Sequence, residues 1–229
     1  MSRAVAGGFL IGVPVLFNVG FGLLAQRFDY PDVLRRPTHE VLSRFRAGGS
    51  SLIVIWWVFA LSAVLFAPLA VLLAGELAGA DGTLVALSVL TGVLAALVQV
   101  LGLIRWPFLV PYLAREAEQA DADSARGEAI DVVFQSLHRY LGVAVGEHLG
   151  YALTGAWTIL TGAALVQSDA VPGWLGVIGV IIGPPFLVCA LEFLGRFEPA
   201  GWKLAGQITP IAYIAWSLWL VALGVALWI

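Results

Sequence analysis

Charged residues are scarce in this sequence of 229 amino acids. Only 12% of the residues are Asp, Glu, Lys or Arg, whereas 60% are hydrophobic and the mean hydropathy is +0.94. A soluble domain usually carries about 25% charged residues. The composition therefore excludes an ordinary soluble domain and predicts a lipid bilayer as the surroundings. The sequence has no basic patch of the kind that binds nucleic acid, so we expect no nucleic-acid partner.

Residue types that form disulfides or bind metals are also few. Cys189 is the single cysteine, so no internal disulfide can form. The three histidines are His39, His138 and His148. Glu147 precedes His148 with no histidine four residues away, so the zinc-protease pattern H-E-x-x-H is missing. We predict no metal site, and the sequence specifies no cofactor.

Six apolar runs dominate the chain instead. Each is long enough to cross a hydrocarbon core of about 30 Å as a helix of about 20 residues. The approximate spans are 5–26, 51–75, 83–106, 140–166, 173–195 and 208–229. The alternating pattern of a membrane β-barrel is missing, so helices must satisfy the backbone. We therefore predict one all-α integral membrane domain over residues 1–229, a polytopic bundle of six transmembrane helices.

The basic residues predict the orientation of this bundle. Of the twelve Lys and Arg residues, only Arg3 lies away from the ends joined by the first, third and fifth connections. Lys and Arg in short loops mark the cytoplasmic face. We therefore expect segments 27–50, 107–139 and 196–207 to be cytoplasmic and both termini to be extracellular, in a plasma (inner) membrane.

Two cytoplasmic connections are predicted to contain further helix. In the first, Pro37 and Thr38 precede a short amphipathic pattern that indicates an interfacial helix. In the second, Pro107 and Pro111 are expected to kink or end the third helix. Asp123 or Ser124 is then expected to cap a helix over about 126–166, whose first dozen residues project into the cytoplasm.

Polar residues inside the spans gather in the predicted cytoplasmic half. On an ideal α-helix, Tyr140, Glu147, Tyr151 and three threonines share one side of the fourth span, whereas His138 faces the opposite way. Ionisable groups within a membrane are unfavourable and usually functional. We expect a polar pocket that opens to the cytoplasm. Its candidate residues are Arg105, His138, Tyr140, Glu147, His148, Tyr151 and Glu192.

A structural interpretation of these residues stays open. Glu147 could simply pair with Arg105, His148 could donate to a helix carbonyl, and the threonines could be ordinary packing surface. The tryptophans, including Trp56 and Trp106, are expected to be mostly anchors at the membrane interface.

Four segments of the sequence carry a resemblance. These are "FDYPDVLRRPTHEVLSRF", "RWPFLVPYLA", "LHRYLGVAVGEHLGY" and "AWSLWLVALGVAL". The chain resembles a bacterial family of small integral membrane proteins classed as a domain of unknown function. This resemblance implies a six-helix membrane fold and includes the region of Arg105, His138, Glu147 and His148, but it implies no reaction.

Three functions remain in competition. The first is a membrane protein with a cytoplasm-facing intramembrane pocket that binds a small or amphipathic molecule. Such a protein would be either a binding protein or an enzyme. The second is a proton-coupled transporter in which Glu147 titrates and a helix break at Gly183, Pro184 and Pro185 is a gate. The third is an accessory or assembly subunit. Whether the protein is an enzyme and which oligomeric state it adopts stay open at this point.

Overall fold

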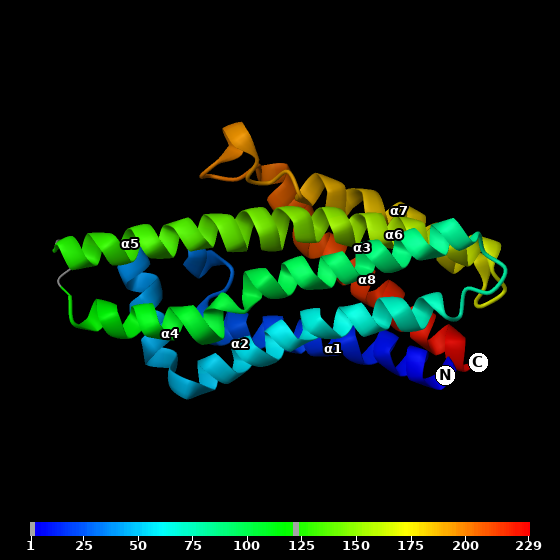
Figure 1. The fold of residues 1–229 in the computed structure, drawn as a ribbon, viewed down its shortest axis with the longest axis horizontal. Coiled ribbons are helices and arrows are strands. Elements are labelled where there is room, and N and C mark those ends of the chain that lie inside the picture. The colour runs from blue at the N-terminus through cyan, green and yellow to red at the C-terminus, as the bar shows by residue number, and fades with distance from the viewer. Residues whose placement is uncertain (1–2, 121–123) are drawn as a thin grey trace.

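Six helices pack lengthwise against one another (Figure 1), and their contacts form a closed ring. The computed structural model describes residues 3–120 and 124–229, and all regular structure in these residues is helical. Each helix of the ring packs against the next, and the last packs against the first. The ring consists of α1 (Arg3–Phe28), α2 (Thr38–Ala74), α3 (Gly82–Leu103), α6 (Gly150–Gln167), α7 (Gly173–Cys189) and α8 (Lys203–Trp228). The predicted all-α, six-helix class is confirmed.

The length and composition of these helices are those of a polytopic membrane protein. Five helical stretches of the described chain are long and apolar enough to cross a bilayer: Arg3–Phe28, Thr38–Ala74, Gly82–Glu118, Ala125–Gln167 and Lys203–Trp228. The sixth, α7, has 17 residues, which is the short end of the range of about 17–25 for a transmembrane helix.

The fourth predicted span belongs to the longest helical stretch of the molecule. It begins with α5 (Ala125–Leu137), continues as the segment η2 (His138–Leu149) and ends with α6. The 43 residues Ala125–Gln167 extend over about 65 Å, roughly twice the hydrocarbon core. The Ser124 hydroxyl caps this helix by accepting a hydrogen bond from the Gly127 amide at 3.1 Å, whereas Asp123 lies outside the described residues.

The η2 segment has π-helical hydrogen bonding over 12 residues. A π-helix joins residues five apart, so it holds more residues per turn than the 3.6 of an α-helix. Such segments are rare, usually a single turn, and frequent at functional sites. The predicted long helix is therefore present, but its middle third has a different rotation per residue from the expected one.

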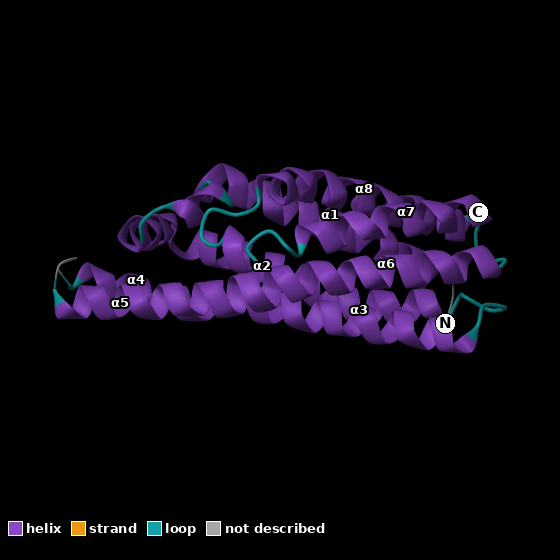
Figure 2. Ribbon diagram, turned by 90° about the horizontal axis from the view of Figure 1, so that it is seen from above, coloured by secondary structure: helices purple, strands orange, loops and turns teal. Residues whose placement is uncertain are grey.

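The helix of the third predicted span is broken just before Pro107 and Pro111. Helix α3 ends at Leu103, and α4 (Arg105–Glu118) begins after Ile104 alone. Pro107 cannot donate to the carbonyl of Leu103, four residues earlier, and its ring clashes there. Helix α4 pairs with α5, and the two extend beyond α1, α7 and α8 (Figure 2).

The predicted interfacial helix is the first part of α2. It follows a loop that contains the short helix η1 (Asp32–Arg35). At Gly49 the backbone leaves helical geometry, with φ 56° and ψ −157°, a conformation that is essentially restricted to glycine. The chain turns there from the interfacial helix into the membrane span.

Two apolar cores hold the bundle together. One lies between the spans and is centred on Phe66, Trp157 and Trp216. The second joins the end of α1, the interfacial helix, α4 and α5. Trp56 and Trp106 stack in this second core, with ring centroids 4.4 Å apart, and are 0% and 1% exposed. The prediction that these two tryptophans anchor the membrane interface was wrong, because aromatic neighbours from the end of α1, the loop after it and the interfacial helix cover them.

Helix α7 continues through Pro184 and Pro185 to Cys189, so the predicted break at these prolines is not found. Glycines explain the tight packing that holds the helix there. A Cβ on Gly155 of α6 would lie 2.8 Å from the carbonyl oxygen of Gly183, which only backbone movement could relieve. The connection from α7 to α8 contains the short helix η3 (Gly195–Phe197).

Candidate functional site

Arg105 is the charged residue on which the site is built. It begins α4, and only 8% of its surface is exposed. Its guanidinium donates to the carbonyl oxygen of Gly102 and lies 3.2 Å from Nδ1 of His138. The same group lies 5.3 Å from the ring centroid of Trp106. A cation at the end of the third predicted span thus contacts the start of η2, and its close partners are neutral.

Glycines bring the two helices close enough for this contact. A Cβ on Gly102 would lie 2.8 Å from Cα of Gly146, so α3 and η2 meet backbone to backbone. A Cβ on Gly142 would lie 2.5 Å from the guanidinium of Arg105. The absence of side chains at these glycines therefore makes the space that Arg105 occupies.

The π-helical geometry places His138 and Glu147 on the same side of the helix. They are nine residues apart, which is two and a half turns of an α-helix and would set them on opposite faces. With more residues per turn, the same nine residues make close to two turns. His138 contacts Arg105, and the Glu147 carboxyl lies within electrostatic range of it.

The structure separates the other candidates. Tyr140 is 66% exposed, and the changed rotation of η2 turns it away from the side it was predicted to share with Glu147. His148 points to the end of α7, where its Nδ1 lies 2.6 Å from the carbonyl oxygen of Ala190. Tyr151 and half-buried Glu192 lie within electrostatic range of Glu147. The structure thus places Arg105, Tyr151 and Glu192 each within electrostatic range of Glu147, and it places His138 beside Arg105.

Two further tyrosines complete the group around Glu147. Tyr30, in the loop after α1, and Tyr213, on α8, lie within electrostatic range of Glu147 and of each other. Sequence patterns indicate these two residues only weakly. Tyr30 belongs to the connection between α1 and α2, and Tyr213 lies in an apolar stretch of α8. Desolvation raises the pKa of the Tyr30 hydroxyl above its ordinary value, so this group is a protonated donor at neutral pH.

The polar groups at the centre of this site lack partners. Within the described part of the chain, neither the Glu147 carboxyl nor the hydroxyls of Tyr30, Tyr151 and Tyr213 form a hydrogen bond or a direct ion pair. These four groups are not completely enclosed by protein atoms. Among the described residues, the only completely enclosed side-chain atoms without a hydrogen bond are Trp56 Nε1 and Thr161 Oγ1. Four unpaired polar groups therefore lie within electrostatic range of one another. We call this set, Glu147 with Tyr30, Tyr151 and Tyr213, the tyrosine–acid cluster.

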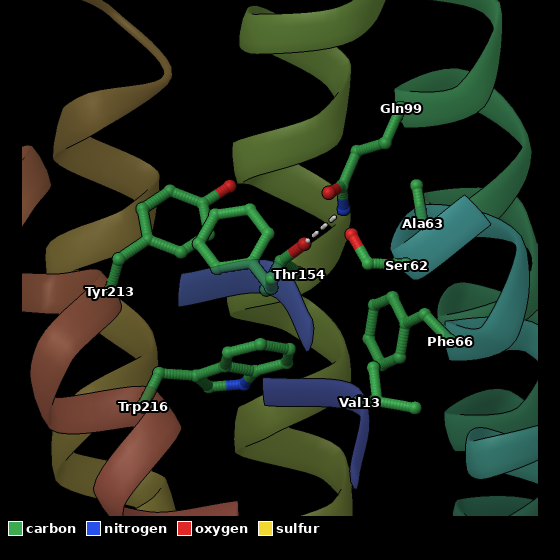
Figure 3. Close-up of a pocket in the computed structure, with 9 residues that line it drawn as sticks. Val13, Ser62, Ala63, Phe66, Gln99, Thr154, Tyr213 and Trp216 are labelled. Atoms are coloured by element: carbon green, nitrogen blue, oxygen red, sulfur yellow. Dashed lines mark hydrogen bonds between the residues drawn. The ribbon is translucent and has the colours of Figure 1, made fainter. Parts of the chain in front are cut away.

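A small cavity lies beside the tyrosine–acid cluster, deeper in the bundle (Figure 3). Tyr213 lines it together with Gln99, Thr154 and Ser62, whose polar atoms face its centre. Gln99 donates to the Thr154 hydroxyl at 3.0 Å. The cavity has a volume of about 20 Å³, which is room for about one water molecule. Apolar side chains make up most of the lining, and Tyr213 is the residue that the cavity shares with the cluster.

The chemistry that these groups offer is hydrogen bonding and proton exchange. Glu147 can accept or carry a proton, and the tyrosine hydroxyls can donate or accept. No group of three His, Cys, Asp or Glu side chains suited to a metal ion occurs among residues 3–120 and 124–229.

Comparison with known proteins places the chain in a family. No curated protein and no solved structure matches it. A family model described as "Domain of unknown function (DUF4386)" matches residues 5–224, which is nearly the whole chain and includes every residue of the site. The family resemblance drawn from the sequence is confirmed: the chain belongs to the family of the domain of unknown function DUF4386.

Proposed function

We propose that this chain is a membrane-embedded protein whose polar site binds a small or amphipathic molecule. It would act either as a binding protein or as an enzyme. The supporting observation is the tyrosine–acid cluster, in which four polar groups lack partners among the described residues. A polar group withdrawn from water without a hydrogen bond costs about 1–3 kcal/mol. A guest that supplies the missing partners would offset this cost.

The site is proposed to open to the cytoplasm of a cell whose plasma membrane holds the bundle. Arg105 and the loop that carries Tyr30 lie toward the same end as α4 and α5, where nearly all Lys and Arg residues are found. Lys and Arg concentrate on the cytoplasmic side of membrane proteins. A guest would then enter from the cytoplasm or from the inner leaflet.

Native mass spectrometry of the protein released from its own membranes tests this function. We expect a small bound mass on the wild type that Glu147→Gln loses. Glu128→Gln is the matched control, because Glu128 is an exposed acid in the first turn of α5. It should retain the bound mass. Identical spectra without a bound mass for all three proteins would contradict the proposal and favour an accessory subunit whose polar residues only join helices.

A proton-coupled transporter is the second candidate. Polar contacts continue along the bundle beyond Glu147, since Trp216 donates to the Thr158 hydroxyl at 3.0 Å and Asn18 donates to the Ser217 hydroxyl at 2.9 Å. These contacts favour a polar route deeper into the membrane. Helix α7 is continuous, so it lacks the break that was expected to act as a gate. Binding at a site open to one side of the membrane is therefore better supported than transport.

A further inference from the structure

A cleft lies between the end of α1 and the end of the interfacial helix, and it shares no residue with the tyrosine–acid cluster. One wall consists of residues 25–29, and the other carries Arg44, Ala47 and Gly48. The cleft is open and has a volume of about 370 Å³. Sites for small molecules usually have volumes of about 300–1,000 Å³. The cleft is therefore large enough for a ligand of the size of a lipid headgroup.

The charges along this cleft leave one cation free. Arg27 is exposed on its wall and forms no hydrogen bond or ion pair with any residue of 3–120 or 124–229. Arg44, on the opposite wall, pairs with Glu40 at 3.1 Å and with Asp29 at 3.6 Å. Arg36 pairs with the same two acids, at 2.6 Å for Glu40 and 2.7 Å for Asp29. These two arginines and two acids balance one another, so the positive charge of Arg27 is the one without a counterion.

The cleft lies where the surface of the bundle changes from apolar to charged. Val19 and Phe21 on α1, and Val54 and Trp57 on α2, are exposed apolar side chains. Such a surface faces lipid chains in a membrane protein, and tryptophan is enriched where the chains meet the headgroups. Both helices pass from this apolar surface to the cleft within about two turns. The cleft is therefore at the level expected for the headgroups of a bilayer.

We infer that this cleft binds the phosphate group of a phospholipid, with Arg27 as the residue that holds it. A guanidinium can bind a phosphate through two parallel hydrogen bonds. Gln26, in the same wall, has an amide that can donate a further hydrogen bond. The phosphodiester of a phospholipid carries a single negative charge, which equals the charge that Arg27 leaves uncompensated. The acyl chains would then lie along the exposed apolar surface of α1 and α2.

Other ligand classes fit this cleft less well. A cation would lie beside Arg27, and like charges close together are unfavourable. Asp29 does not exclude an anion in the same way, because Arg36 and Arg44 both pair with its carboxylate. Free inorganic phosphate offers the same oxygens to Arg27, but it has no apolar part for the neighbouring surface of α1 and α2. A phospholipid matches both the free charge and the position of the cleft.

Lipid titration followed by native mass spectrometry of the full-length protein in detergent tests this site. The probes are phosphatidylglycerol, the diacylglycerol with the same acyl chains, and inorganic phosphate. We expect the first phosphatidylglycerol to bind about fivefold tighter than the diacylglycerol, the usual effect of one arginine near anionic lipid. Arg27→Gln should abolish this preference. Arg115→Gln is the matched control and should retain it, because Arg115 is also exposed and without a partner among the described residues but lies outside the cleft.

Ala47→Leu is a second variant, which narrows the cleft without changing any charge. It should also reduce the preference for phosphatidylglycerol, whereas Glu147→Gln should leave it unchanged because the two sites are separate. Displacement of phosphatidylglycerol by inorganic phosphate at the same concentration would support a phosphate site but assign it to a soluble ligand. Equal binding of phosphatidylglycerol and diacylglycerol to the wild type would overturn the inference. The same loss in Arg27→Gln and Arg115→Gln would overturn it too, because it would show a general attraction of basic side chains and no site in the cleft.

Discussion

Arg105 shows how a single residue can organise the interior of a membrane protein. It is charged but only 8% exposed, and its partners are a carbonyl, an imidazole and an indole ring. Arg105→Leu would remove a charge-assisted hydrogen bond and leave Glu147 without its nearest buried cation. We expect it to lower the free energy of unfolding by about 2–3 kcal/mol, measured by thermal unfolding in detergent.

Arg115→Leu is the control for that change. Arg115 is exposed in the last turn of α4, so its loss should change the stability by no more than about 0.5 kcal/mol. Equal and negligible effects of both substitutions would mean that Arg105 contributes no interaction that stabilises the fold.

The ionisable residues of the site could be recognised from the sequence because charge is rare within apolar runs. Arg105, Glu147 and His138 stand out for this reason, and the structure brings them together. Tyr140 could not be placed correctly, since its direction depends on the π-helical rotation of η2. Tyr30 was missed because its position depends on how a polar connection folds back onto the bundle.

Among the elements, the crossing of α3 and η2 depends on glycine. A Cβ at residue 102 would lie 2.8 Å from Cα of Gly146 and 3.0 Å from the carbonyl oxygen of Leu141, both backbone atoms that cannot move cheaply. We expect Gly102→Ala to destabilise the protein by about 1–3 kcal/mol, the usual cost of overpacking. Circular dichroism during heating measures the effect.

Gly12→Ala is the matched substitution in α1. A Cβ there meets nothing within 4 Å, and alanine is the better helix former, by up to about 1 kcal/mol. Its stability should be unchanged or slightly raised. If Gly102→Ala behaves in the same way, the two helices do not meet as closely as described.

The helical elements were largely predictable, whereas their internal geometry was not. Hydrophobicity, the cap at Ser124 and the Thr38 pattern indicated the spans, the long fourth helix and the interfacial helix. A shift from α to π hydrogen bonding leaves no such trace, because the residues of η2 are compatible with both. Pro184 and Pro185 led to the wrong prediction of a helix break in α7. The helix continues through both prolines because glycines let α6 and α7 pack closely there.

For the whole molecule, the distribution of Lys and Arg predicts both termini and the α6–α7 connection outside the cell. Cysteines introduced at Ile229 and Asp169, both exposed, should be labelled by an impermeant thiol reagent in intact cells. A cysteine at exposed His39 should be labelled only after the membrane is opened. Cys189 is buried and is replaced by alanine in all variants. The reverse pattern of labelling would invert the bundle and place the site on the outer side.

We propose that Glu147 serves a bound molecule and not the fold. Its carboxyl forms no hydrogen bond or direct ion pair with any described residue, so an amide of the same shape should be tolerated. The most direct test is the free energy of unfolding of the purified, ligand-free wild type and of Glu147→Gln at pH 7. The account predicts a difference of less than about 1 kcal/mol. A loss of about 3 kcal/mol or more would show that Glu147 is a charged, structurally paired residue and would contradict the account.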